Sequence, residues 1–168
     1  MNFEEKIIER LKRIEREVER LRVWERPDDN HIVTVLAISP PQTYYYKIAT
    51  LPAATPSTYD HLVIEGVGSG FAASQKAYFT ITFGNRAGFN ADTSFNSNKT
   101  PDFLFGIVPI RAYQENDGSI SIYAVAIANL YGLLTVRLVD QIQATIYKNP
   151  VGVTTAPTGT KVYDLAEV

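Results

Sequence analysis

The sequence predicts a mainly β protein: an N-terminal α-helical coiled-coil stalk, a short hinge, and a β-sandwich, jelly-roll-like head that assembles as a homotrimer. We place the stalk at residues 1–26, the hinge at 27–30 and the head at 31–168. Two observations predict this organisation. Apolar residues recur at heptad spacing near the N-terminus. After residue 30, short stretches rich in Val, Ile, Thr and Tyr are separated by turn residues.

The stalk carries its apolar residues alternately four and three positions apart. They are Ile7, Leu11, Ile14, Val18 and Leu21, and nearly everything between them is Glu, Arg or Lys. This is the a/d spacing of a coiled coil, and a lone helix of this kind cannot bury its seam. Further copies of the chain are therefore expected to supply the partner helices.

The number of copies is predicted from the residues of the seam and beside it. Val at an a position with Leu at d favours dimers, whereas Leu at a with Ile at d favours higher states. Residues 10–15 resemble a short trimerisation motif in which Arg10 pairs with Glu15 of the neighbouring helix. We therefore favour a homotrimer. The alternative is a helix that packs against its own β domain, which Ile8 beside the seam allows.

The charged residues are unevenly distributed. The chain has 18 acidic and 16 basic residues, and residues 1–30 alone hold 9 of the acidic and 8 of the basic ones. Neither part is basic, so no binding of nucleic acid is expected. The chain has no cysteine, which excludes disulfides, thiol catalysis and cysteine-ligated metals. It has no apolar run of membrane-spanning length and no signal-type N-terminus, so we expect synthesis in the cytoplasm without membrane insertion.

The head is expected to contain eight or nine short strands. They are predicted at 31–39, 44–51, 61–66, 77–83, 103–113, 119–128, 133–139, 143–147 and 162–165. The Asp117–Gly118 pair is a hairpin signal, and 133–139 is expected to pair with 143–147. The stretch 119–128 is apolar on both faces towards its end, which fits a strand covered by its own second sheet and by a neighbouring subunit.

The glycine-rich stretch Gly66–Gly70 follows a predicted strand. No helix pattern comes after it and its glycines lack the spacing of a nucleophile elbow, so we interpret it as a tight turn or bulge. His31 and His61 are the only histidines. Asp60 and Glu65, five positions apart on one strand, point to opposite faces. We therefore expect no catalytic residue, no metal, no cofactor and no enzyme activity.

Several stretches of the head resemble head domains at the ends of bacteriophage fibre and tail-appendage proteins. They are 45–52, 57–66, 83–86, 110–114, 117–119 and 144–150. The resemblance implies a homotrimeric virion protein, made in the host cytoplasm, that binds a host-surface receptor or decorates the particle. Its N-terminal stalk would dock onto other virion proteins. The resemblance carries no receptor-binding residue over to this chain.

The candidate binding site is the segment 87–101, which is long for a loop in a compact β domain. Its aromatic side chains offer apolar faces, and its amides and carboxylate offer hydrogen-bonding groups, a combination that suits sugars. The residues are Phe89, Asn90, Asp92, Phe95, Asn96 and Asn98. The alternative is that both Phe side chains anchor the loop to the core or to the trimer interface.

These features support three functions in descending order. The first is a trimeric phage fibre or appendage whose head binds a host-surface glycan. The second is a non-adhesive capsid decoration or head fibre. The third is a glycan-depolymerising enzyme, which ranks last because the acid–base pair of a glycosidase is missing.

Overall fold

The computed structural model describes Lys12 and residues 32–55, 60–70, 76–95 and 108–168. These residues form eleven strands and one short 3₁₀ helix, so the prediction of a mainly β protein is confirmed. Lys12 is helical and exposed. The other residues of the predicted stalk, its seam included, and the hinge lie outside the described residues.

The strands follow one another along the chain, and η2 ends it. The bounds are β1 Ile32–Ile38, β2 Tyr44–Leu51, β3 His61–Ser69, β4 Lys76–Gly84, β5 Asn90–Phe95, β6 Ile110–Gln114, β7 Ile120–Ala126, β8 Tyr131–Ile142, β9 Thr145–Ile146, β10 Gly152–Val153, β11 Thr160–Asp164 and η2 Leu165–Glu167.

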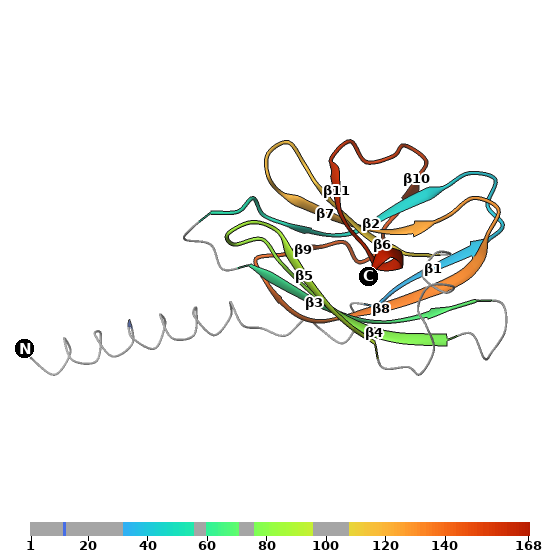
Figure 1. The fold of residues 1–168 in the computed structure, drawn as a ribbon, viewed down its shortest axis with the longest axis horizontal. Helices are drawn as coiled ribbons and strands as arrows, with labels where there is room; N and C mark the ends of the chain where they lie inside the picture. The colour runs from blue at the N-terminus through green and yellow to red at the C-terminus, as the bar shows by residue number, and fades with distance from the viewer. Residues whose placement is uncertain (1–11, 13–31, 56–59, 71–75, 96–107) are drawn as a thin grey trace, which may run out of the picture.

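The strands form two sheets that lie as two layers (Figure 1). The first sheet has the order β1-β8-β3-β4-β5, and the second has the order β10-β2-β7-β6-β11 with β9 beside β2. Every pairing among the described strands is antiparallel. One hydrophobic core joins the layers, with Phe79 and Leu134 from the first sheet and Ile48 and Ile122 from the second.

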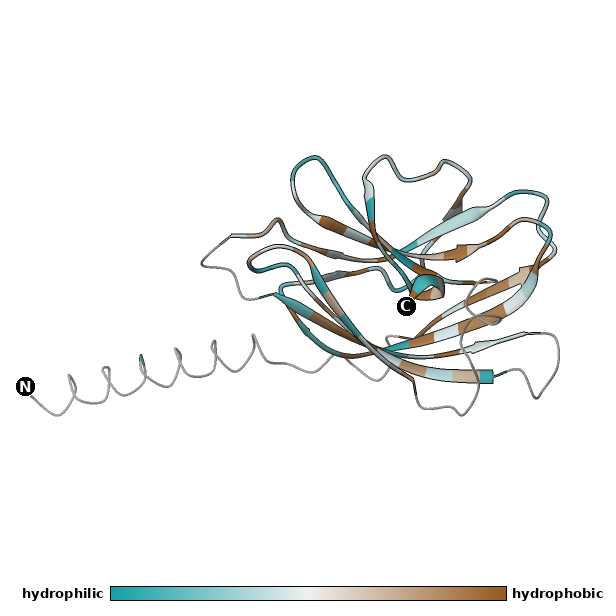
Figure 2. Cartoon of the chain, viewed as in Figure 1, coloured by the Kyte–Doolittle hydropathy of each residue, from teal (hydrophilic) through white to brown (hydrophobic). Residues whose placement is uncertain are grey.

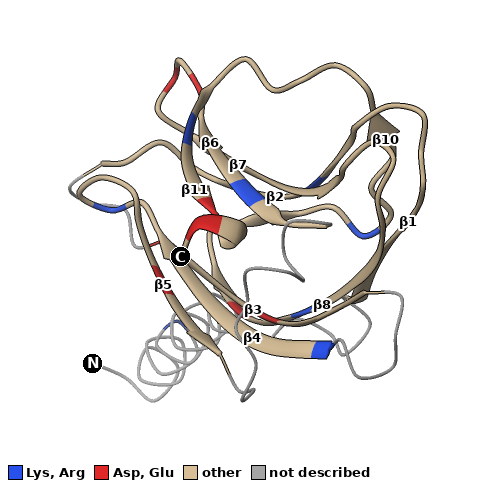
Figure 3. Cartoon of the chain, turned by 45° about the vertical axis from the view of Figure 1, so that its right-hand side comes forward, with Lys and Arg blue, Asp and Glu red and all other residues tan. Residues whose placement is uncertain are grey.

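Alternation along the strands explains why these segments form two-faced sheets. On β4, Phe79, Ile81 and Phe83 are buried, while Tyr78 is exposed, as the period-two pattern predicts. Hydrophobic and hydrophilic residues alternate along the strands of the first sheet in Figure 2. Charged residues of the described head are sparse and scattered in Figure 3, in keeping with its neutral composition.

One prediction about pairing is wrong, and one is confirmed. The segment 143–147 was expected to pair with 133–139, but β9 pairs with β2, and Tyr147 N donates to Ile48 O at 3.0 Å. The reason is that β8 continues to Ile142, where it still pairs with β3, so the chain turns only afterwards. The predicted hairpin at Asp117–Gly118 is present: β6 pairs with β7, and Gly118 adopts a left-handed φ of 83°.

The interpretation of Gly66–Gly70 as a tight turn or bulge is also wrong, because Gly66 and Gly68 lie inside β3. The pairing of β3 with β4 is regular there and places Gly66 opposite Phe79. A Cβ atom at Gly66 would lie 2.2 Å from Phe79 Cζ. The glycine therefore leaves room in the core for a large aromatic ring on the neighbouring strand.

The strand β7 is buried on both faces within a single chain, so a neighbouring subunit is not needed to explain its apolar outer face. Ser121 and Val125 on its outer face have no exposed surface. Tyr113 lies opposite Ser121 and Tyr45 opposite Val125 in the sheet register. Both tyrosine rings contact Tyr123 edge-on, at centroid distances of 5.7 and 6.3 Å. Tyrosines of the same sheet therefore cover this face.

A buried asparagine joins the two sheets at one end. Asn85, directly after β4, donates its side-chain amide to Pro52 O at 2.8 Å and to Gly118 O at 3.0 Å. Its backbone N–H donates to the carboxylate of buried Asp60 at 2.9 Å. Pro52 follows β2 and Gly118 lies in the β6–β7 hairpin, so one side chain of the first sheet binds two turns of the second.

We expect Asn85→Asp to destabilise the fold by about 2–5 kcal/mol, because it removes donors from two carbonyls in a buried site and introduces a charge there. Asn149→Asp makes the same chemical change at an exposed position and should stay within about 0.5 kcal/mol of wild type. Urea unfolding at one fixed protein concentration measures both. Equal stability of the two variants would show that Asn85 does not join the sheets.

Gly66→Ala tests the close packing of β3 against β4. The added methyl overpacks the core, so we expect a loss of about 1–3 kcal/mol. Adding Phe79→Leu to Gly66→Ala should cost less than the sum of the two single changes, because the smaller side chain accommodates the methyl. Thr82→Ala, at an exposed position of β4, is the control. Thermal unfolding at matched concentration provides the comparison, and strict additivity would contradict the proposed contact.

Candidate functional site

The segment 87–101, predicted as a loop, contains a strand. Residues Asn90–Phe95 form β5, which pairs with β4 from Gly84 to Phe79. The loop prediction is therefore wrong for these residues, because the free edge of β4 supplies a hydrogen-bonding partner for a polar segment. The candidate residues Asn96 and Asn98 lie outside the described residues.

The polar candidates lie in one row on the outer face of the first sheet. Asn90, Asp92 and Ser94 alternate along β5 and are all exposed. Asp92 lies opposite Thr82, and Ser94 lies opposite Thr80. The phenylalanines of β4 point into the core, so these threonines point outward. We call Thr80, Thr82, Asn90, Asp92 and Ser94 the polar row.

The two aromatic candidates do not lie in the polar row. Phe89 and Phe95 are half-buried and pack against the hydrophobic core. The ring of Phe89 lies 6.1 Å from that of Phe83, tilted by 32°. This geometry agrees with the alternative considered for these side chains, in which they anchor the segment to the core. It agrees less well with stacking on a ligand.

A hydroxyl pair fixes the middle of β5 to the second sheet. Thr93 Oγ1 and Tyr163 Oη lie 2.8 Å apart in a hydrogen bond, and the Tyr163 ring packs edge-on against Phe83 at 5.1 Å. Burial raises the pKa of the Tyr163 phenol to about 12, although the hydrogen bond with Thr93 lowers it. The phenol therefore stays neutral at physiological pH, and the polar row rests on an anchored strand.

The carboxylates and histidine considered for catalysis are engaged separately. Glu65 pairs with Arg137 at 2.7 Å. His61 Nε2 lies 3.2 Å from Asp140 Oδ2. Asp60 is buried and accepts from the backbone of Asn85. Within the described part of the chain, no group of three His, Cys, Asp or Glu side chains is placed to hold a metal ion. Likewise, no helix of that part is long and apolar enough to cross a membrane.

A tyrosine surface on the second sheet was missed by sequence reasoning. Tyr45, Tyr113 and Tyr123 contact one another on its outer face. Nearby, the Lys47 ammonium lies 5.7 Å from the centre of the Tyr147 ring, and Tyr147 is 37% exposed. The alternation of β2 and β7 signals that these residues share a face. Their mutual contacts depend on strand order, which the local pattern does not give.

Comparisons with known proteins assign no family. No protein-family model matches the chain, and no curated protein matches it. Among solved structures, it is similar to WceF of Pantoea stewartii, described as a glycan biofilm modifying enzyme with a bacteriophage tailspike-like parallel beta-helix fold. The identity is 13% and the TM-score is 0.43, over 77% of this chain and 21% of that one.

A second solved structure is the tailspike protein of the Acinetobacter phage vB_ApiP_P1. The identity is 9% and the TM-score 0.33, over 71% of this chain and 23% of that one. The chain thus spans less than a quarter of the length of either structure. Both TM-scores are low, and neither similarity assigns a function to this chain.

Tyr163→Phe tests the anchoring of β5. Loss of the hydroxyl leaves Thr93 without this partner, and we expect a cost of about 1 kcal/mol at neutral pH. The folded-state pKa of about 12 exceeds the ordinary value of 10. The phenol's contribution is therefore complete below pH 10 and is lost as the pH rises towards 12.

The difference in unfolding free energy between wild type and Tyr163→Phe should accordingly shrink between pH 10 and pH 12. Urea titrations at the two ends of this range measure it. Thr154→Ala, an exposed change that removes no titratable group, is the control, and its difference from wild type should stay constant over the same range. A difference that stays constant with pH would contradict burial of the Tyr163 phenol.

Proposed function

We propose that the protein is a homotrimeric bacteriophage fibre or tail appendage whose head binds a glycan receptor on the host surface. The heptad seam supports assembly into parallel copies, and the resemblance of the head to phage fibre heads supports a place in the virion. In this proposal the N-terminal stalk docks onto other virion proteins and the β-sandwich head presents the receptor site. The proposed ligand contact needs no cofactor or metal.

The polar row is the observation that carries the receptor-binding part of the proposal. Its amide, carboxylate and hydroxyl groups provide both donors and acceptors, which sugar hydroxyls require. The strand beneath it is held by Thr93, Phe95 and the β4 ladder. Because the backbone that carries these groups is already held in a strand, no backbone entropy needs to be lost when a ligand binds.

Trimerisation would make weak binding sufficient. The polar row consists of four exposed polar side chains and the partly exposed Thr80 on the outer face of a sheet, so one site is expected to bind weakly. Three heads held by one stalk convert the second and third contacts into intramolecular events, which raises the overall affinity without any new contact. This is the advantage of displaying the head in several copies.

One observation favours the second candidate, a non-adhesive capsid decoration or head fibre. Phe89 and Phe95 pack against the core, so neither phenylalanine candidate offers the polar row a platform for a sugar ring. A glycan-depolymerising enzyme remains the third candidate, because Glu65 and Asp60 of the described chain are engaged with different partners.

The combined variant Asn90→Ala with Asp92→Ala tests the receptor site. Both positions are exposed, so folding and oligomeric mass should not change. Adsorption to host cells, or binding to an array of bacterial surface glycans, should fall at least about tenfold, which corresponds to about 1.4 kcal/mol. Thr154→Ala with Thr155→Ala, exposed after β10, is the matched control.

Three outcomes separate the candidates. A loss confined to the β5 variant supports the polar row as the receptor site. Unchanged binding by that variant would place the contact elsewhere, with the tyrosine surface as the next region to test. A wild-type protein that binds neither cells nor glycans, while labelling of intact particles finds it on the capsid, would favour the decoration function.

A further inference from the structure

The outer face of the first sheet carries a second surface, at the opposite edge from the polar row. On β1 the outward residues Ile32, Leu36 and Ile38 are 51%, 56% and 64% exposed. Val67 on β3 and Tyr78 on β4 continue this surface across the sheet, as far as the strand that carries Thr80 and Thr82 of the polar row. We call these five residues the β1 face.

The residues of the β1 face are joined by the sheet register. Thr34 lies opposite Thr135, which lies opposite Val67, which lies opposite Tyr78. Next to this row, Leu36 lies opposite Leu133 of β8. The surface therefore crosses four strands, with a polar strip between the apolar residues of β1 and Val67 and Tyr78, where the hydroxyls of Thr34 and Thr135 lie 3.3 Å apart in a hydrogen bond.

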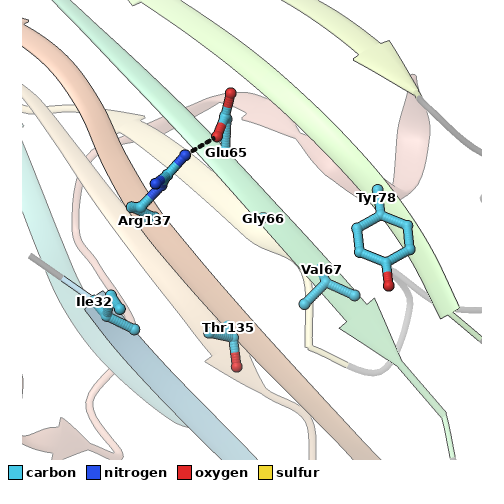
Figure 4. A pocket seen from close by; sticks show the side chains of 7 residues that line it. All are labelled: Ile32, Glu65, Gly66, Val67, Tyr78, Thr135 and Arg137. Atoms are coloured by element: carbon cyan, nitrogen blue, oxygen red, sulfur yellow. Dashed lines mark hydrogen bonds and ion pairs between the residues drawn. The ribbon is translucent and has the colours of Figure 1, made fainter. Parts of the chain in front are cut away.

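A shallow depression of about 200 Å³ lies within this surface. Figure 4 shows Ile32, Val67 and Tyr78 around it. The ion pair between Glu65 and Arg137 lies at one side of the depression, with Arg137 Nη2 2.7 Å from Glu65 Oε2. An apolar centre with a charged border is the usual anatomy of a protein interface.

The position of β1 strengthens the argument for an interface. β1 is an edge strand, and β8 is the one described strand that pairs with it. Its seven residues, Ile32–Ile38, include no charge and no proline. Long apolar edge strands promote association, and soluble proteins normally protect them with charges, prolines or a covering element. β5, at the other edge, carries Asn90 and Asp92.

We infer that the β1 face is the contact of the head with a second copy of this chain, around the axis of the proposed homotrimer. The inference rests on the proposed assembly and adds the surface through which the heads meet. The last seam position is Leu21, and residues 22–31 join it to Ile32. Eleven residue steps reach at most about 40 Å. The β1 face therefore begins within that distance of the seam.

The size of the face explains why a stalk accompanies it. Seven residues of β1 and the three strand spacings from β1 to β4 cover on the order of 300 Å² of sheet. A stable interface buries roughly 800 Å² per partner. The face alone is thus too small for a strong contact, and the stalk raises the effective concentration of the heads for one another.

The test uses the full chain, which has no cysteine of its own. Leu36→Cys places a single thiol in the β1 face, on its edge strand. Val153→Cys places one at an apolar residue of β10 that is similarly exposed, at 48% compared with 56% for Leu36. Light scattering first establishes the mass of each variant, and a maleimide reagent then measures the labelling rate of each thiol, native and in urea.

If the β1 face is covered by another copy, the native thiol of the Leu36→Cys variant should react at least about tenfold more slowly than that of Val153→Cys, because it must wait for local opening. In urea the two rates should agree. A short bismaleimide should yield covalent dimers from Leu36→Cys and few from Val153→Cys, because the inference places the β1 faces of the copies against one another at the axis, whereas a threefold contact away from the axis joins different residues.

Other results overturn the inference in distinguishable ways. Slow labelling of Leu36→Cys without covalent dimers would mean that the face is covered, but not by the same face of another copy, and would overturn contact of the β1 faces at the axis. Equal labelling of the two variants in an oligomer would mean that the heads meet elsewhere, while the proposed assembly survives. A mass of one chain for the wild type would overturn the assembly and the interface together.

Discussion

The side chain of Asn85 is the interaction on which the arrangement of the two sheets depends at one end. Its amide binds carbonyls of two turns in the second sheet, while its backbone N–H binds Asp60 at the start of β3. β4 ends at Gly84 and β5 begins at Asn90. The hydrogen bonds of Asn85 therefore hold the chain in place where it leaves β4 and turns back into β5, the strand that carries most of the polar row.

The two edges of the first sheet have opposite chemistry, although both face outward. The β5 edge presents amide, carboxylate and hydroxyl groups, and the β1 edge presents Ile and Leu with no charge. Charge and polarity keep a free edge from pairing with other chains, whereas an apolar edge invites contact. One sheet can thus serve two roles, with ligand contact on one side and contact between copies on the other.

The sequence predicts the elements whose signal is local. β2 has the predicted bounds, and β4 shows the predicted alternation, because a period of two is visible in the residues themselves. Gly66 was misjudged because its role depends on Phe79 of the neighbouring strand. β5 was missed because an exposed edge strand needs no apolar alternation. The polar candidates Asn90 and Asp92 are exposed as a binding site requires, but the orientation of Phe89 and Phe95 depends on core packing.

In the proposed trimer neither association element is strong by itself. A helix with a seam of about two heptads is marginal in isolation, and the β1 face covers less sheet than a standard interface buries. Residues 22–31 connect the two elements, so formation of either one raises the local concentration of the other. Assembly should then be cooperative. Heads without a stalk would associate only weakly, whereas heads joined by the stalk would form a stable trimer. In this proposal, assembly also determines how many polar rows are presented together to a host surface. Contact through the apolar β1 edge would thereby affect the affinity with which the polar β5 edge binds its ligand.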